Sequence, residues 1–157
     1  MVATRSFVRA AALGALALIA GPAQAALGGQ AAAIADERTA MQAQLRSVAA
    51  AGHVRHELTL PNGGSVHEFA NAAGAVFAVT WNGPGKPDLR TLLGSHFAAL
   101  QGAGRAPGRF GRIRRHPASV DAGGLQIQTG GHMGWFWGVA YLPALAPPGF
   151  DPAELAK

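Results

Sequence analysis

The chain has 157 residues and a formal net charge of +5; 49% of its residues are hydrophobic and only 13% are charged. This composition excludes a disordered charged tail and a coiled coil, and the length suits one folded domain. The absence of cysteine excludes disulfides, thiol catalysis, iron–sulfur clusters and cysteine-ligated zinc.

The first 25 residues are typical of a secretory signal peptide. Arg5 and Arg9 form a basic start, an apolar stretch runs from Ala10 to Ala20, and Ala23-Gln24-Ala25 offers the small residues that a signal peptidase accepts. The apolar stretch is shorter than the roughly 18 residues that a membrane anchor needs. We therefore expect cleavage after Ala25 and export by the general secretory route, to the periplasm or the exterior.

The mature chain is then a single domain over residues 26–157, with no transmembrane segment. Loss of two of the 13 basic residues leaves a net charge of +3 against 8 acidic residues. A helix is predicted from about Gln30 to Val48, where four apolar residues fall on one side at the helical period. These residues are Ile34, Met41, Leu45 and Val48.

Three strands are predicted next. Apolar and polar residues alternate from Val54 to Leu60, and Pro61-Asn62-Gly63-Gly64 turns the chain into a second strand, Ser65 to Ala70. The preferred register pairs Leu58 with Phe69, because pairing Leu58 with His67 would set two glutamates against each other.

The third strand, Ala75 to Trp81, is apolar on both faces, which indicates a central position in the sheet. A three-residue loop would pair Phe69 with Phe77. Asp88 is placed to cap a following helix, whose apolar residues recur at the helical period before Gly102 and Gly104 end it. These residues are Leu89, Leu92, Leu93, His96, Phe97 and Leu100.

An arginine-rich loop is predicted as far as Pro117. Two final strands follow, from about Gly124 to Thr129 and from Met133 to Leu142, joined by Gly130-Gly131, and a single helical turn is predicted from Asp151 to Leu155. The short turns favour an α+β fold: an antiparallel sheet of about five strands, a three-stranded meander plus a hairpin, with two helices on one face.

Three segments carry a family resemblance. They are Ala26 to Gly29, Val76 to Pro84 with its continuation through Pro87-Asp88-Leu89 to Leu92-Leu93-Gly94, and Val120 to Leu125 with its continuation at Gly131 to Gly134. In this order they resemble an uncharacterised family of small exported bacterial proteins, domain of unknown function 2844. The resemblance implies an exported single domain and brings no catalytic or ligand-binding residue with it. Trp135 and Trp137 depart from the smaller residues that we expect there in that family.

Histidines raise two possibilities for chemistry. His56 and His67 would lie on one face of adjacent strands, but the preferred register separates them and no carboxylate shares the face of His56, so we expect no metal site and no cofactor. His132 lies in a glycine-rich turn, where Asp121 or Asp88 could orient it as a general base. The interpretation without a catalytic role, in which His132 is an ordinary residue of a hairpin turn, is favoured.

A stripe of large residues marks one face of the last strand. Its members are Met133, Trp135, Trp137, Val139 and Tyr141. Such stripes usually pack into a core, so burial is expected, and the alternative is an exposed platform that stacks on a sugar or a peptide. The segment from Arg105 to His116 is expected to be a solvated loop, with Arg109, Arg112, Arg114 and Arg115 as candidates for contact with anionic groups.

These observations favour an exported, non-catalytic binding or structural component of the cell envelope. Anionic envelope lipid, polysaccharide or a protein at a sheet edge are the partners considered, and nucleic acid is not expected. The candidate binding residues are Arg109, Arg112, Arg114, Arg115, His132, Trp135 and Trp137. The competing hypothesis is a small periplasmic hydrolase or metal-dependent enzyme centred on His132.

Overall fold

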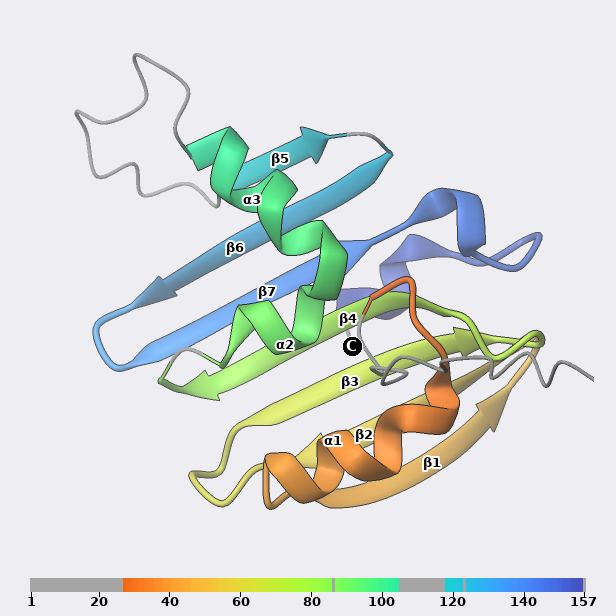
Figure 1. Ribbon diagram of the computed structural model, residues 1–157, viewed down its shortest axis with the longest axis horizontal. Coiled ribbons are helices and arrows are strands. Elements are labelled where there is room, and N and C mark those ends of the chain that lie inside the picture. The colour runs from red at the N-terminus through yellow and green to blue at the C-terminus, as the bar shows by residue number, and fades with distance from the viewer. Residues whose placement is uncertain (1–26, 86, 105–117, 123, 157) are drawn as a thin grey trace, which may run out of the picture.

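The computed structural model describes residues 27–85, 87–104, 118–122 and 124–156. They form an α+β domain on one open antiparallel sheet of seven strands in the order β1-β2-β3-β4-β7-β6-β5 (Figure 1). The strands are β1 (Gln44–Ala50), β2 (His53–Thr59), β3 (Ser65–Asn71), β4 (Val76–Pro84), β5 (Ala118–Ala122), β6 (Leu125–His132) and β7 (Trp135–Tyr141). The predicted class is confirmed, and β1 and β5 are the strands that the sequence did not indicate.

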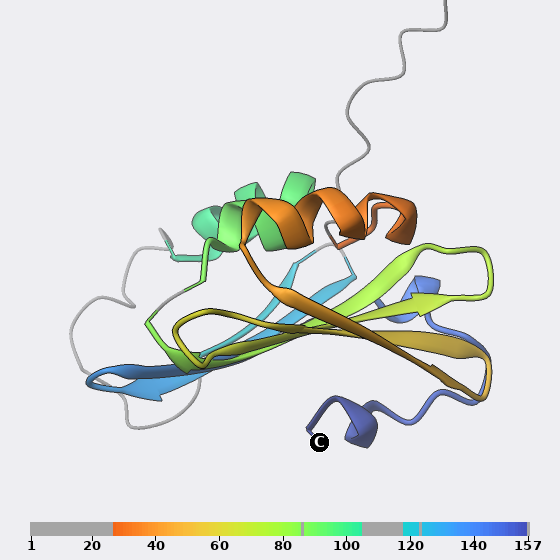
Figure 2. The same ribbon diagram turned by 90° about the horizontal axis from the view of Figure 1, so that it is seen from below.

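Helices cover one side of the sheet, and the C-terminal segment crosses the other (Figure 2). We call these sides the helix face and the tail face. The helix face carries η1 (Ala31–Ala33), α1 (Ile34–Ala40), α2 (Leu89–Leu93), η2 (Gly94–His96) and α3 (Phe97–Gly104). Of the two short C-terminal helices, η3 (Pro143–Leu145) follows the end of β7, and η4 (Pro152–Ala156) lies on the tail face. The predicted helices on one face are therefore confirmed, as is the predicted turn near the C-terminus.

The first predicted helix is wrong beyond Ala40. Gln42 has a left-handed backbone (φ 52°), which ends the helix, and the amide N–H of Ala43 donates to the carbonyl of Arg38 at 2.9 Å. The chain continues as edge strand β1. Residues three apart lie on one side of a helix but on opposite faces of a strand, so in β1 Leu45 and Val48 do not share a face.

The predicted register of the first hairpin is also wrong. The turn closes between Leu60 and Gly64, whose N–H···O distance is 2.8 Å, so Leu58 faces Val66 rather than Phe69. The short loop sets this register, because a longer one would be needed to bring Phe69 opposite Leu58. As a result Glu68 lies opposite His56 on the helix face, and Phe69 lies on the tail face.

A β-bulge interrupts the pairing of β3 with β4. Ala70 pairs with Val76 and Phe69 pairs with Ala78, so the predicted pairing of Phe69 with Phe77 is wrong by one residue. The extra residue, Phe77, turns to the tail face beside Ala78, and its ring centroid lies 6.2 Å from that of Phe69. The sheet therefore has a second, aromatic core on its tail face.

The predicted cap of the next helix is confirmed, whereas the helix itself and the final turn differ from the prediction. Asp88 caps α2: its Oδ1 accepts from the amide of Arg90 at 2.9 Å. The predicted helix is broken at Gly94, which has φ 50°. The final turn lies at Met133-Gly134 and not at Gly130-Gly131, because the glycine pair continues β6 and Gly134 supplies the left-handed residue (φ 86°).

Candidate binding surface on the tail face

The C-terminal segment covers only part of the tail face. Its Phe150 packs edge-on against Phe77, with ring centroids 4.8 Å apart, and against His53 at 5.3 Å. Tyr141 and Val139 join this cluster, whereas Trp135 and Trp137 beyond them stay 40% and 36% exposed. Burial of the predicted stripe is therefore right at its Tyr141 end and wrong for the two tryptophans.

Both tryptophans are held in place by the neighbouring strands. The indole Nε1 of Trp135 donates to Oδ1 of Asn82 at 2.6 Å. The ring of Trp137 lies across Gly130, where a side chain on β6 would collide with it. Alternation along β7 places both rings on the tail face, so they form an ordered surface that we call the tryptophan platform.

Uncharged polar groups surround the tryptophan platform. Polar residues of β3, β4 and β6 are half-exposed or exposed on the same face, level with Trp137 or farther along β7 towards Tyr141: Ser65, His67, Thr80, Asn82, Gln126 and Gln128. The carboxylate of Glu57 lies farther across the sheet, on β2, where Arg55 pairs with it at 2.6 Å. The surface beside the tryptophans thus offers hydroxyls, amides and an imidazole around two aromatic rings.

His132 lies at the exposed end of β6. Its Nδ1 is 3.3 Å from the carbonyl oxygen of Met133, whose side chain at the hairpin apex is 99% exposed. A cleft of about 500 Å³ separates the hairpin from the start of α2 and is lined by His132 and mainly apolar groups. These include Trp81, Leu89, Phe136 and Trp137.

In the described part of the chain, neither of the two carboxylates considered as partners of His132 is seen to form a hydrogen bond or an ion pair with it. Asp88 is engaged as the cap of α2, where Oδ2 also accepts from Thr91 Oγ1 at 2.9 Å, and these hydrogen bonds lower its pKa. Asp121 lies in β5, opposite Gln126, and its side chain is outside the described set. Within the described ranges no ion pair joins His132 to a carboxylate.

The other histidines are separated by the sheet. The sequence placed His56 and His67 on one face, but the observed register puts His56 on the helix face and His67 on the tail face. Ser47 Oγ lies 2.8 Å from His56 Nδ1, and partial burial lowers the pKa of both histidines. Among the described residues there is no group of three or more histidines and carboxylates that could hold a metal ion.

Two buried glutamates form a cluster that the sequence did not indicate. Glu37 of α1 is 6% exposed and Glu68 of β3 is 0% exposed, and their carboxyl groups face each other beneath α1. Burial raises the pKa of Glu68 to about 9, reinforced by the negative charge of Glu37, and raises that of Glu37 to about 7. The sequence signal that could have pointed to this cluster is Glu37 itself, a charged residue between the apolar residues Ile34 and Met41.

Some predicted features lie outside the described residues. They are the leader, the predicted cleavage position and the candidates Arg109, Arg112, Arg114 and Arg115. None of the helices that the structure does describe combines the length and the apolar character needed to span a membrane.

Comparison with known proteins assigns a family. No curated protein and no solved structure matches the chain significantly. The family model described as "Protein of unknown function (DUF2844)" matches residues 23–155, which include all of the sheet and both cores. The chain therefore belongs to the DUF2844 family of proteins of unknown function.

Proposed function

We propose that this protein is an exported, non-catalytic binding component of the cell envelope, and that it holds an envelope polysaccharide on the tryptophan platform. The observation that carries the proposal is the exposure of Trp135 and Trp137 on the part of the tail face that the aromatic core does not occupy. Exposed aromatic side chains keep a large apolar area in contact with water, which is unfavourable. A cluster of them therefore marks a contact surface.

A polysaccharide matches this surface better than a lipid or the apolar surface of another protein does. A pyranose ring has apolar C–H faces, which stack on aromatic rings, and a rim of hydroxyls, which need hydrogen-bonding partners. The face supplies both, with Asn82 opposite Trp137, and with Thr80 and Gln128 opposite the next residue on this face of β7, Val139. A β-linked chain would lie along the open face of the sheet without having to enter a closed pocket.

The platform is also preorganised. The hydrogen bond from Trp135 to Asn82 and the packing of Trp137 on Gly130 fix both rings before a ligand arrives. Binding then costs less side-chain ordering, which favours affinity. Export remains part of the proposal and is supported by the features of the first 25 residues.

The test is cosedimentation of the mature chain with isolated cell-wall sacculi, whose glycan strands are β-linked pyranoses. We expect the double variant Trp135→Ala/Trp137→Ala to lose at least tenfold in affinity, and Gln101→Ala, on the helix side, to bind as the parent does. Equal binding by parent and double variant would overturn the proposal. So would retention on anionic lipid vesicles that depends on Arg112, Arg114 and Arg115 and not on the tryptophans.

The competing hypothesis of a hydrolase or metal-dependent enzyme has one observation in its favour, the cleft beside His132. A general base there would need an orienting group within hydrogen-bonding reach. The variant His132→Ala separates the two ideas: it should leave sacculus binding within about twofold if the platform acts alone, and it would abolish any activity centred on this histidine.

A further inference from the structure

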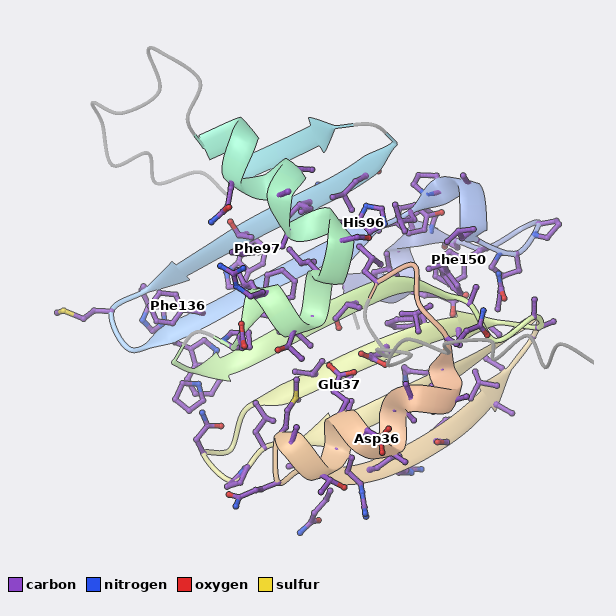
Figure 3. The ribbon with its side chains drawn as sticks, in the orientation of Figure 1. Asp36, Glu37, His96, Phe97, Phe136 and Phe150 are labelled. Carbon is purple, nitrogen blue, oxygen red and sulfur yellow. The ribbon has the colours of Figure 1, made fainter. Side chains whose placement is uncertain are left out.

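The carboxyl groups of Glu37 and Glu68 lie together in the core, where at least one of them has to be protonated for a hydrogen bond to form between them. As carboxylates both groups only accept hydrogen bonds, and none of their four oxygens has a partner among the described residues. A proton on one group allows it to donate to the other, which lies within hydrogen-bonding reach. Figure 3 shows Glu37 reaching from α1 towards β3, whereas the neighbouring Asp36 is exposed.

In the described part of the chain, no positive charge is paired with these two carboxyl groups. On the sheet, Glu68 is flanked by Val79 of β4 and by His56 of β2, which contacts Ser47 of β1 and whose burial favours the neutral imidazole. On α1, Ile34 lies on the same side of the helix as Glu37. Within the described ranges no lysine or arginine forms an ion pair with either glutamate.

We propose that Glu37 and Glu68 form a proton-operated latch that holds α1 on the sheet. With a shared proton the pair is a hydrogen bond within the core and α1 stays docked. Removal of the protons leaves two adjacent negative charges in an apolar site, which their mutual repulsion and their loss of hydration both oppose. The charges return to water when α1 lifts from β3.

The part that can move is α1. Glu68 lies near the centre of the sheet, in a strand that is paired on both sides. In contrast, α1 has seven residues and buries only Ile34 and Glu37. It continues into the edge strand β1, so lifting it disturbs only one border of the sheet. The pKa values of about 7 and about 9 place this transition between neutral and alkaline pH.

A single introduced thiol can report the position of α1, because the chain has no cysteine. Ile34→Cys places the thiol under α1, and Ala35→Cys places it on the exposed side as a matched control for thiolate formation. We expect the ratio of their alkylation rates to rise at least tenfold between about pH 6 and about pH 10. The rise should disappear in Glu37→Gln/Glu68→Gln and persist in Glu57→Gln.

A second measurement needs no variant. Carbon-13 titration of the carboxyl groups in the unmodified protein should show two glutamates that titrate above about pH 6. The latch is overturned by a flat alkylation ratio, by an equal rise without the two carboxyls, or by titration of every glutamate below about pH 5.5. Loss of sheet circular dichroism together with α1 release would also overturn it, since the whole domain would then unfold. The inference stands apart from the polysaccharide proposal, because sacculus binding does not require α1.

Discussion

The indole ring of Trp81 lies across Gly138 of the neighbouring strand, on the helix face, just as Trp137 lies across Gly130 on the tail face. The two pairs differ in burial: Trp81 belongs to the core, and Trp137 is exposed. The same glycine-to-alanine change should therefore have two different consequences.

At Gly138 the added methyl group would enter space that the buried Trp81 ring fills. We expect Gly138→Ala to lower the free energy of unfolding by about 1–3 kcal/mol, the usual cost of overpacking a core. At Gly130 the exposed ring can move aside, so Gly130→Ala should cost less than about 1 kcal/mol while weakening sacculus binding. Urea denaturation measures the first effect, and a Gly138→Ala variant as stable as the parent would contradict the observed packing.

The hydrogen bond between Trp135 and Asn82 gives a second prediction. Asn82→Ala removes the acceptor and frees the indole ring, so sacculus affinity should fall several-fold. Stability should change by less than about 1 kcal/mol, because both side chains are exposed. Asn82→Asp keeps an acceptor at the same position and should retain the affinity. If the two variants bind alike, this hydrogen bond does not orient the platform.

The buried glutamates predict how stability depends on pH. Both folded pKa values, about 7 and about 9, lie above the ordinary value of 4.5, so the folded state holds protons that the unfolded state has released. Their contribution is fully present below about pH 4.5 and is lost as the pH rises through 7 towards 9. Relative to Glu37→Gln/Glu68→Gln, the parent should lose about 2–3 kcal/mol per pH unit from about pH 5 to about pH 7, because the folded state there holds nearly two protons more than the unfolded state.

Denaturant titrations of both proteins at a series of pH values measure this difference. Comparing them removes groups that act in the opposite direction, such as Asp88, whose lowered pKa adds stability that is lost as the pH falls. A difference that stays constant over the whole range would show that the pair ionises normally.

Packing of Phe150 on the tail face gives the fourth prediction. This ring contacts Phe77, His53 and Tyr141 and anchors the C-terminal segment on the sheet. Phe150→Ala should cost about 2–3 kcal/mol, and Phe150→Leu about 1 kcal/mol, because leucine fills part of the space. Sacculus binding should be retained by both variants, since the tryptophan platform lies beyond the tail. Equal stability of Phe150→Ala and parent would show that the tail is not anchored by this ring.

Local features of the sequence predicted most of the elements. Alternation between Val54 and Leu60, the Asp88 cap and the turn at Pro61-Asn62-Gly63-Gly64 each depend on interactions within a few residues, and each is present in the structure. The pairings were less predictable. The register between β2 and β3 was set by the closure of one loop at Gly64, and the bulge at Phe77 shifted the next pairing by one residue.

The candidate site shows the same division. Its tryptophans were recognised from their spacing on β7, but their exposure depends on where the C-terminal segment stops covering the sheet. The glutamate pair depends on two residues 31 positions apart in the sequence, brought together because α1 packs over β3. No pattern within either segment contains that information.

By itself, then, the sequence determined the fold class and the candidate aromatic strand, because period, turn chemistry and composition are properties of neighbouring residues. Only the tertiary structure decided which aromatic rings stay in contact with water and which carboxyl groups leave it. Exposure and ionisation depend on what covers a side chain, and the covering groups here come from segments distant in the chain.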